Sequence, residues 1–240
     1  GGTALDADAL SRELGIVASA VARAAWSTHG TAVFAYGDGA GRVRVTLGRD
    51  HRGPNAALRM LPDEAPPLDR LNVPKAAEWL TGRGLILVTG APGSGKTVTL
   101  GALVRALGER QRRVVTIEDP IELVHTGSMI SLRAVGEHVP SVRAGVEAAM
   151  AEGADAIVVG AVASPEAASA VLDAVLGGYL VLTTVGALTA GLALDRVIAY
   201  VGSDQRELAR AALGEALLGT IKPVVGARGS RTFETTGRSG

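Results

Sequence analysis

The segment of the sequence that most restricts the fold is the run at 90–97, which satisfies the pattern G-x-x-x-x-G-K-[ST]. It follows an apolar stretch at 84–89 that is typical of a buried strand, and it precedes a helical pattern at 96–108. In that context the glycines let backbone N–H groups turn toward phosphate, and the helix N-terminus adds partial positive charge. The sequence therefore predicts a phosphate-binding loop. Its residues are Ala91, Pro92, Gly93, Ser94, Gly95, Lys96, Thr97 and Val98.

Two of these side chains have specific expected roles. Lys96 is expected to reach the β- and γ-phosphates of a nucleotide, and the Thr97 hydroxyl to bind Mg²⁺. Only three of the 24 basic residues are lysines, so Lys96 stands out in a chain that otherwise uses arginine. ATP and Mg²⁺ are accordingly the expected ligands.

Short apolar strands and helical stretches alternate from residue 84 onward, which predicts an α/β fold with a mostly parallel sheet covered by helices. Upstream, a helix over 6–26, a hairpin over 31–47 and a strand at 55–61 predict a small α+β domain. Three prolines at 62–67 mark the change between the two patterns. We therefore expect an N-terminal domain, a linker, a nucleotide-binding domain and a disordered tail. Their ranges are 1–71, 72–83, 84–226 and 227–240.

The composition excludes several classes of protein. Without cysteine there is no disulfide framework, thiol nucleophile or cysteine-bound metal. The 24 basic and 24 acidic residues balance, so no global charge attracts nucleic acid, and nucleic acid is not an expected partner. No apolar stretch approaches the roughly 18 residues of a spanning helix, so membrane insertion is not expected either.

Three carboxylates follow the strand expected at 113–117, in a turn that contains Pro120. Ligands of open α/β sheets bind at the carboxyl ends of the strands, where this turn lies. The candidate catalytic residues are Glu118, Asp119 and Glu122.

Further motifs occur in the order and spacing of one family, the type II/IV secretion ATPases. The chain resembles this family, and within it most closely the twitching-motility ATPases that retract type IV pili. The matching segments are 84–97, 116–122, 155–160, 165–167, 180–184 and 195–198. The resemblance implies a RecA-like P-loop NTPase domain after a small, truncated N-terminal domain. It also implies a homo-hexamer or mixed ring that works with a platform protein at the inner membrane, on the cytoplasmic side.

The chain departs from the family pattern at several functional positions. The family has a glutamate, the acidic end of Walker B, where Ala161 stands, then an arginine and an aspartate at the positions of Ala163 and Ser164. A family histidine falls at Gly186 and another commonly at Tyr179. A family arginine falls at Glu147.

These departures leave more than one function open. One is an ATP-binding motor subunit of a pilus or secretion system whose hydrolysis is impaired. The alternative is a regulatory or structural paralogue that binds nucleotide without hydrolysing it and assembles with a true motor. A P-loop kinase is disfavoured because no acceptor-binding lid is evident. The resemblance also makes Arg44 and Arg59 candidate nucleotide contacts, the alternative being solvated charges on strands.

Overall fold

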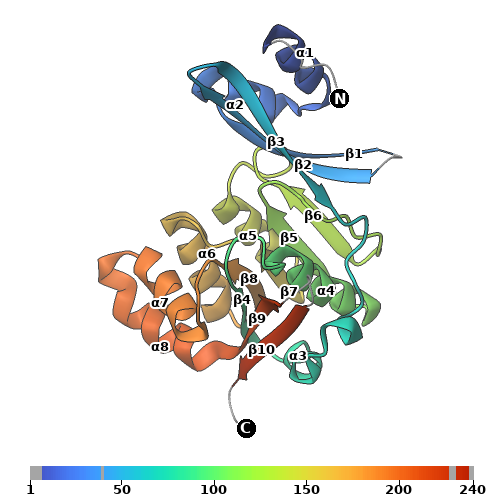
Figure 1. The fold of residues 1–240 in the computed structure, drawn as a ribbon. Coiled ribbons are helices and arrows are strands. Elements are labelled where there is room, and N and C mark those ends of the chain that lie inside the picture. Colours follow the sequence, from blue (N-terminus) through green and yellow to red (C-terminus); the bar gives the residue numbers. More distant parts are fainter. Residues whose placement is uncertain (1–6, 39–40, 227–230, 238–240) are drawn as a thin grey trace. The chain divides into compact units, whose positions relative to one another are not determined.

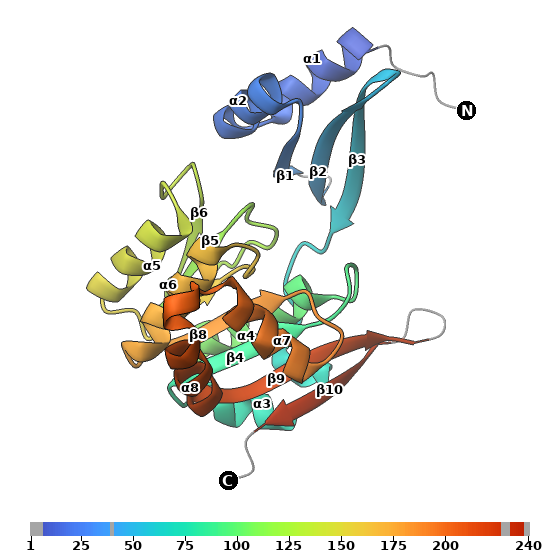
Figure 2. The same ribbon diagram turned by 90° about the vertical axis from the view of Figure 1, so that its left-hand side faces the viewer.

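The computed structural model describes residues 7–38, 41–226 and 231–237 (Figures 1 and 2). The chain forms two compact units. Unit 1 comprises residues 1–63 together with the short segment 119–123, and unit 2 comprises residues 64–118 and 124–240. The α/β class with a small N-terminal domain, expected from the sequence, is confirmed.

Unit 1 contains two helices and an antiparallel sheet with strand order β1-β2-β3. Its elements are α1 (Ala7–Val17), α2 (Ala20–His29), β1 (Ala32–Asp38), β2 (Gly41–Asp50) and β3 (Gly53–Leu61). The single helix expected over 6–26 is wrong, because the chain breaks at residues 18–19. Ser19 caps α2, its Oγ accepting a hydrogen bond from the backbone N–H of Ala22 at 3.2 Å.

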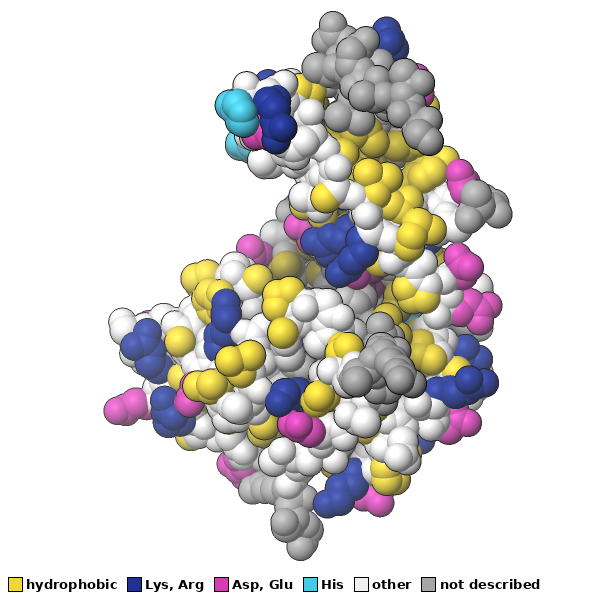
Figure 3. Space-filling view, in the orientation of Figure 1, with side chains coloured by type: hydrophobic (Ala, Val, Ile, Leu, Met, Phe, Trp, Pro, Cys, Tyr) yellow, Lys and Arg dark blue, Asp and Glu magenta, His cyan; other side chains and the backbone are white. Residues whose placement is uncertain are grey.

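The two faces of the β1-β2-β3 sheet differ in chemistry. On one face Phe34 and Val45 lie opposite each other and are buried with residues of α2. On the other face Arg44 lies opposite Arg59. The edge strand β3 leaves Leu58 exposed, and Figure 3 shows hydrophobic side chains gathered over the strands of this unit.

Unit 2 is built on a seven-stranded sheet with the order β10-β9-β4-β8-β7-β5-β6, parallel except for β10. The strands are β4 (Gly84–Thr89), β5 (Val114–Glu118), β6 (Ile130–Ala134), β7 (Ala156–Val159), β8 (Leu180–Val185), β9 (Leu217–Val225) and β10 (Arg231–Gly237). The helices are η1 (Leu68–Leu71), α3 (Pro74–Trp79), α4 (Lys96–Glu109), α5 (Val142–Ala151), α6 (Pro165–Leu176), α7 (Ala190–Tyr200), η2 (Ser203–Gln205) and α8 (Arg206–Ala216).

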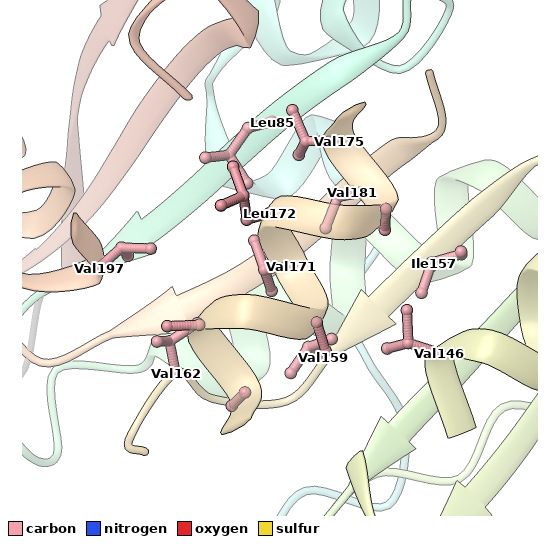
Figure 4. Packing of buried hydrophobic residues seen from close by; sticks show 14 of the residues in the cluster. Leu85, Val146, Ile157, Val159, Val162, Val171, Leu172, Val175, Val181 and Val197 are labelled. Carbon is pink, nitrogen blue, oxygen red and sulfur yellow. The ribbon is translucent and has the colours of Figure 1, made fainter. Parts of the chain in front are cut away.

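Helices cover both faces of this sheet. Side chains of α3 and α4 pack on one face, and those of α5, α6, α7 and α8 pack on the other. Figure 4 shows part of the second cluster, with the side chains of α6 directed at the strands. The strands are buried on both faces, which is why they appear in the sequence as continuous apolar runs rather than alternating ones.

Two expected boundaries differ from the structure. The segment expected to be a linker at 72–83 contains α3, and its Trp79 and Leu80 are buried in unit 2. The tail expected to be disordered from 227 contains β10, which pairs with β9, while residues 227–230 and 238–240 lie outside the described residues. Trp79 links the two segments. It belongs to α3, and its indole ring packs against Gly219 of β9 and Gly237 of β10.

Candidate nucleotide-binding site

The phosphate-binding loop leaves the sheet at the end of β4 and enters α4 directly. Gly90, Gly93 and Gly95 have φ values of 142°, 78° and 104°, in a region that residues with a side chain rarely adopt. Three glycines in this short segment therefore match three backbone positions that need them. Successive backbone N–H groups in such a loop form a concave anion-binding surface, and the free N–H groups of the first helical turn extend it.

Lys96 lies across the loop. Its Nζ donates hydrogen bonds to the carbonyl oxygens of Gly90 and Ala91, both at 2.9 Å. The loop is further closed by a hydrogen bond from the N–H of Ser94 to the oxygen of Ala91. Thr97 is the second residue of α4, so its hydroxyl lies at the same helix end. The structure thus brings together the residues that the sequence predicts for phosphate binding.

The strand order fixes which loops lie beside the phosphate-binding loop. Moving from β4 through β8 and β7 to β5, the strands end in turn at Thr89, Val185, Val159 and Glu118. Hydrogen bonds join these ends: Thr184 Oγ1 donates to the oxygen of Gly160 at 2.7 Å, and the N–H of Gly160 donates to Ile117. The ends of the four strands form one continuous edge.

Glu118 lies at this edge, in unit 2. Its Oε1 accepts a hydrogen bond from Thr116 Oγ1 at 2.9 Å. A Cβ atom on Gly160 would lie only 3.2 Å from Cγ of Glu118, so the missing side chain at Gly160 makes room for the glutamate. Of the three acidic candidates, Glu118 is the one that the structure places among the strand ends of unit 2.

Glu122 and Asp119 belong to the segment of unit 1 instead. Glu122 is buried and forms ion pairs with Arg44 and Arg59, while Arg42 donates to the carbonyl oxygens of Ile121 and Glu122 at 2.7 and 2.8 Å. We call Arg42, Arg44, Arg59 and Glu122 the arginine cluster. The sequence patterns do not predict this cluster. The available signal was the alternation in β2 and β3, which puts Arg44 and Arg59 on one face once the strands pair in register.

The positions at which the sequence is expected to depart from the family pattern lie in different surroundings. Ala161 and Ala163 are exposed in the turn after β7, and Ser164 caps α6 through a hydrogen bond from the N–H of Ala167. Gly186 has open space where a side chain would begin. Glu147 is an exposed residue of α5 that lies 3.7 Å from Arg143.

The histidines do not form a metal site in the described part of the chain, where no group of three potential ligand side chains occurs. His138 accepts a hydrogen bond at Nδ1 from the N–H of Ala134. His125 lies in the loop after the 119–123 segment, and its pKa is lowered mainly by burial and secondly by the positive charge of Arg105. None of the helices within the described ranges is long and apolar enough to cross a membrane.

Comparison with known proteins agrees with this geometry. The profile of the family described as "Type II/IV secretion system protein" matches residues 51–218. The chain belongs to this family. A twitching motility protein of Neisseria gonorrhoeae is 36% identical over 185 residues, covering 75% of this chain and 50% of that protein. The chain spans about half the length of the curated relatives it matches.

Solved structures support the same assignment. The pilus retraction motor PilT with bound ADP aligns with a TM-score of 0.80 and 31% identity, over 96% of this chain and 70% of that one. The ATPase DotB of Legionella pneumophila shares the fold, with a TM-score of 0.81 at 23% identity, over 98% of this chain and 69% of that one. The resemblance to the family's retraction ATPases, inferred from the motifs, is confirmed.

Proposed function

We propose that the chain binds ATP with Mg²⁺ as a motor-type ATPase subunit of a type IV pilus or secretion system, and that its ATP hydrolysis is impaired. We infer nucleotide binding from the phosphate-binding loop, where three glycines adopt positive φ and Lys96 donates hydrogen bonds to the carbonyl oxygens of Gly90 and Ala91. The relative PilT, whose structure contains ADP, supports a nucleotide as the ligand.

The residues present fit this ligand. Backbone N–H groups of residues 93–98 would hold the phosphates, Lys96 would exchange its carbonyl partners for phosphate oxygens, and Thr97 would bind Mg²⁺. Glu118 supplies a carboxylate at the same sheet edge. We propose Glu118 as the acidic residue that orients Mg²⁺ or the attacking water, rather than Asp119 and Glu122, because these two belong to unit 1 and Glu122 is paired with Arg44 and Arg59.

We infer the impairment of ATP hydrolysis from the residues at the strand ends next to the phosphate-binding loop. Phosphoryl transfer is catalysed by positioning and charge stabilisation, and losing one such group typically costs on the order of 100- to 1,000-fold in rate. Ala161 and Gly186 follow the two strands that separate β4 from β5, and neither has a polar side chain. The family places an acid and a histidine at these positions.

We further propose that the chain works in a ring, either a homo-hexamer or a mixed ring with a related ATPase, on an inner-membrane platform protein and on the cytoplasmic side. The named relatives, a twitching motility protein and a pilus retraction motor, support a pilus or secretion setting.

The residues at positions 161 and 186, Ala161 and Gly186, also favour a second function. A subunit that binds ATP but lacks the acid at 161 can serve as a regulatory or structural member of a ring whose true motor subunits hydrolyse ATP. Turnover of the chain alone and in a mixture with a complete ATPase of the family separates the two: an impaired motor hydrolyses ATP slowly by itself, whereas a regulator has no turnover alone and changes that of the partner.

Binding and turnover should be measured on the same preparation. We expect the wild-type chain to bind Mg·ATP, Lys96→Ala to bind it at least about tenfold more weakly, and the exposed Lys75→Ala control to bind it normally. Turnover in the ordinary range of about 1–10 per second would contradict impairment, and a wild-type chain that binds no nucleotide would contradict both functions. Light scattering with and without Mg·ATP tests ring formation.

A further inference from the structure

Two side chains from different elements hold the loop between β8 and α7, residues 186–189. Arg196 of α7 donates from Nη1 to the carbonyl oxygen of Gly186 at 2.7 Å. Thr89, the last residue of β4, donates from Oγ1 to the oxygen of Ala187 at 2.9 Å. Two consecutive carbonyl groups of the loop therefore accept hydrogen bonds from side chains of two different elements.

This loop adjoins the phosphate-binding loop. Thr89 pairs with Val185 in the parallel register of β4 and β8, so the chain leaves β8 beside Gly90. Thr89 also directly precedes Gly90, whose oxygen accepts a hydrogen bond from Lys96. A displacement of the 186–189 loop would therefore change the position of Thr89 and of Gly90, where the phosphate-binding loop begins.

Apolar packing restrains this loop only in part. Gly186 has no neighbour within 4 Å of where its Cβ would lie, and the side chain of Leu188 is 67% exposed, whereas Ala187 is partly buried against the core and its N–H donates to the oxygen of Val185 at 3.1 Å. The hydrogen bonds from Arg196 and Thr89 add two further restraints on the backbone of the loop. A backbone carbonyl that turned toward bound phosphate would repel it, and the guanidinium keeps the oxygen of Gly186 engaged.

We propose that Arg196 is a positioning residue of the nucleotide site: it fixes the 186–189 loop beside the phosphate-binding loop, and its charge adds to the positive potential there. This inference rests on the proposed function. Arginine suits the task because its planar fork is always charged and reaches back from the second turn of α7 to the start of the loop.

The test compares Arg196→Ala with Arg196→Lys and with a matched control, Arg210→Ala. Arg210 is an exposed arginine of α8 that lies 3.3 Å from Asp195, next to Arg196 in the sequence, and it donates no hydrogen bond to the loop. The probe is a fluorescent ATP analogue with Mg²⁺. We expect Arg196→Ala to weaken binding roughly 5- to 10-fold, Arg196→Lys to weaken it less, and Arg210→Ala to change it by less than about twofold.

Two further measurements distinguish a local effect of Arg196 on the loop from a general effect on the stability of the fold. The urea midpoint of Arg196→Ala should equal that of Arg210→Ala, while hydrogen exchange in residues 187–189 of the nucleotide-free protein should be faster only in Arg196→Ala. In a double-mutant cycle with Thr89→Val, the two losses of affinity should be non-additive because both act on one loop.

The outcomes separate the two proposals. If the wild-type chain binds no nucleotide, the proposed function fails. If the wild-type chain binds and Arg196→Ala binds equally well, with unchanged exchange in the loop, the role of Arg196 is overturned and the proposed function stands.

Discussion

Arg59 donates from Nη2 to both carboxylate oxygens of Glu122, at 2.9 and 2.8 Å, although 63 residues separate them in the chain. Arg44 pairs with the same carboxylate. The segment 119–123, which continues from β5, is thereby held against the sheet of unit 1 by one buried acid.

Removing this acid should destabilise unit 1. Glu122→Ala leaves two guanidiniums without their partner, and because these are partly exposed, 33% for Arg44 and 54% for Arg59, we expect a loss of about 1–2 kcal/mol rather than the full cost of a buried pair. Urea unfolding followed by Trp26 fluorescence in a Trp79→Phe background reports on this unit. Glu13→Ala, which removes an exposed carboxylate of α1, is the control; equal midpoints for the two variants would contradict the prediction.

Introducing the acid that the family pattern leads us to expect at position 161 should raise turnover. Ala161 is exposed at the end of β7, so a glutamate fits there without disturbing the core, and Ala161→Glu is expected to increase kcat at least about tenfold. Ala151→Glu places the same charge at an exposed residue at the end of α5, before the opposite end of β7, and serves as the control. The explanation of impaired hydrolysis is wrong if both variants remain as slow as the wild type.

Ser164 should be replaceable by aspartate but not by alanine. Its Oγ accepts a hydrogen bond at 3.2 Å from the N–H of Ala167 at the start of α6. Ser164→Ala should cost about 1 kcal/mol, and Ser164→Asp should cost little, because aspartate is an equally good N-cap. Thermal denaturation of the three proteins checks this. An unchanged midpoint in Ser164→Ala would mean that the cap contributes nothing, and a loss in Ser164→Asp as large as in Ser164→Ala would mean that aspartate does not cap this helix.

Gly219 should tolerate no side chain. A Cβ there would lie 2.2 Å from Trp79 Cη2, so Gly219→Ala must displace the buried indole and should cost about 1–3 kcal/mol. Gly214→Ala, at an exposed position of α8 with open space around it, should be neutral or stabilising by up to about 1 kcal/mol. Urea midpoints compare the two, and a stable Gly219→Ala would indicate that β9 does not pack on Trp79.

Stability should fall as the pH decreases through the range of His125. Burial and the nearby Arg105 lower the folded-state pKa of His125, so the folded protein favours the neutral imidazole. The resulting stabilisation is complete above the unfolded pKa of about 6.5 and is lost as the pH falls below it. The drop in urea midpoint between about pH 7.5 and 5.5 should be smaller for His125→Gln than for the wild type or His51→Gln. A drop of the same size in all three would show that His125 does not contribute.

Local sequence patterns were sufficient for the elements whose structure depends on neighbouring residues. The strand at 84–89, the glycines at 90, 93 and 95 and the helix from Lys96 follow from apolar periodicity and backbone sterics, which act over a few residues. The same patterns predicted the strand at 113–117, which the structure has at Val114–Glu118.

What only the tertiary structure decided are relations between distant segments. The pairing of Glu122 with Arg44 and Arg59, the burial of Trp79 by Gly219 and Gly237, and the contact of Arg196 with the loop beside Gly90 each join parts of the chain whose spacing carries no signal. They depend on the strand order and on the pairing register, which are set by how the whole sheet buries its two faces. For this reason the sequence by itself determined a glycine-rich loop between a strand and a helix of an α/β domain, whereas folding determined which carboxylate lies at the sheet edge and which is held by arginines.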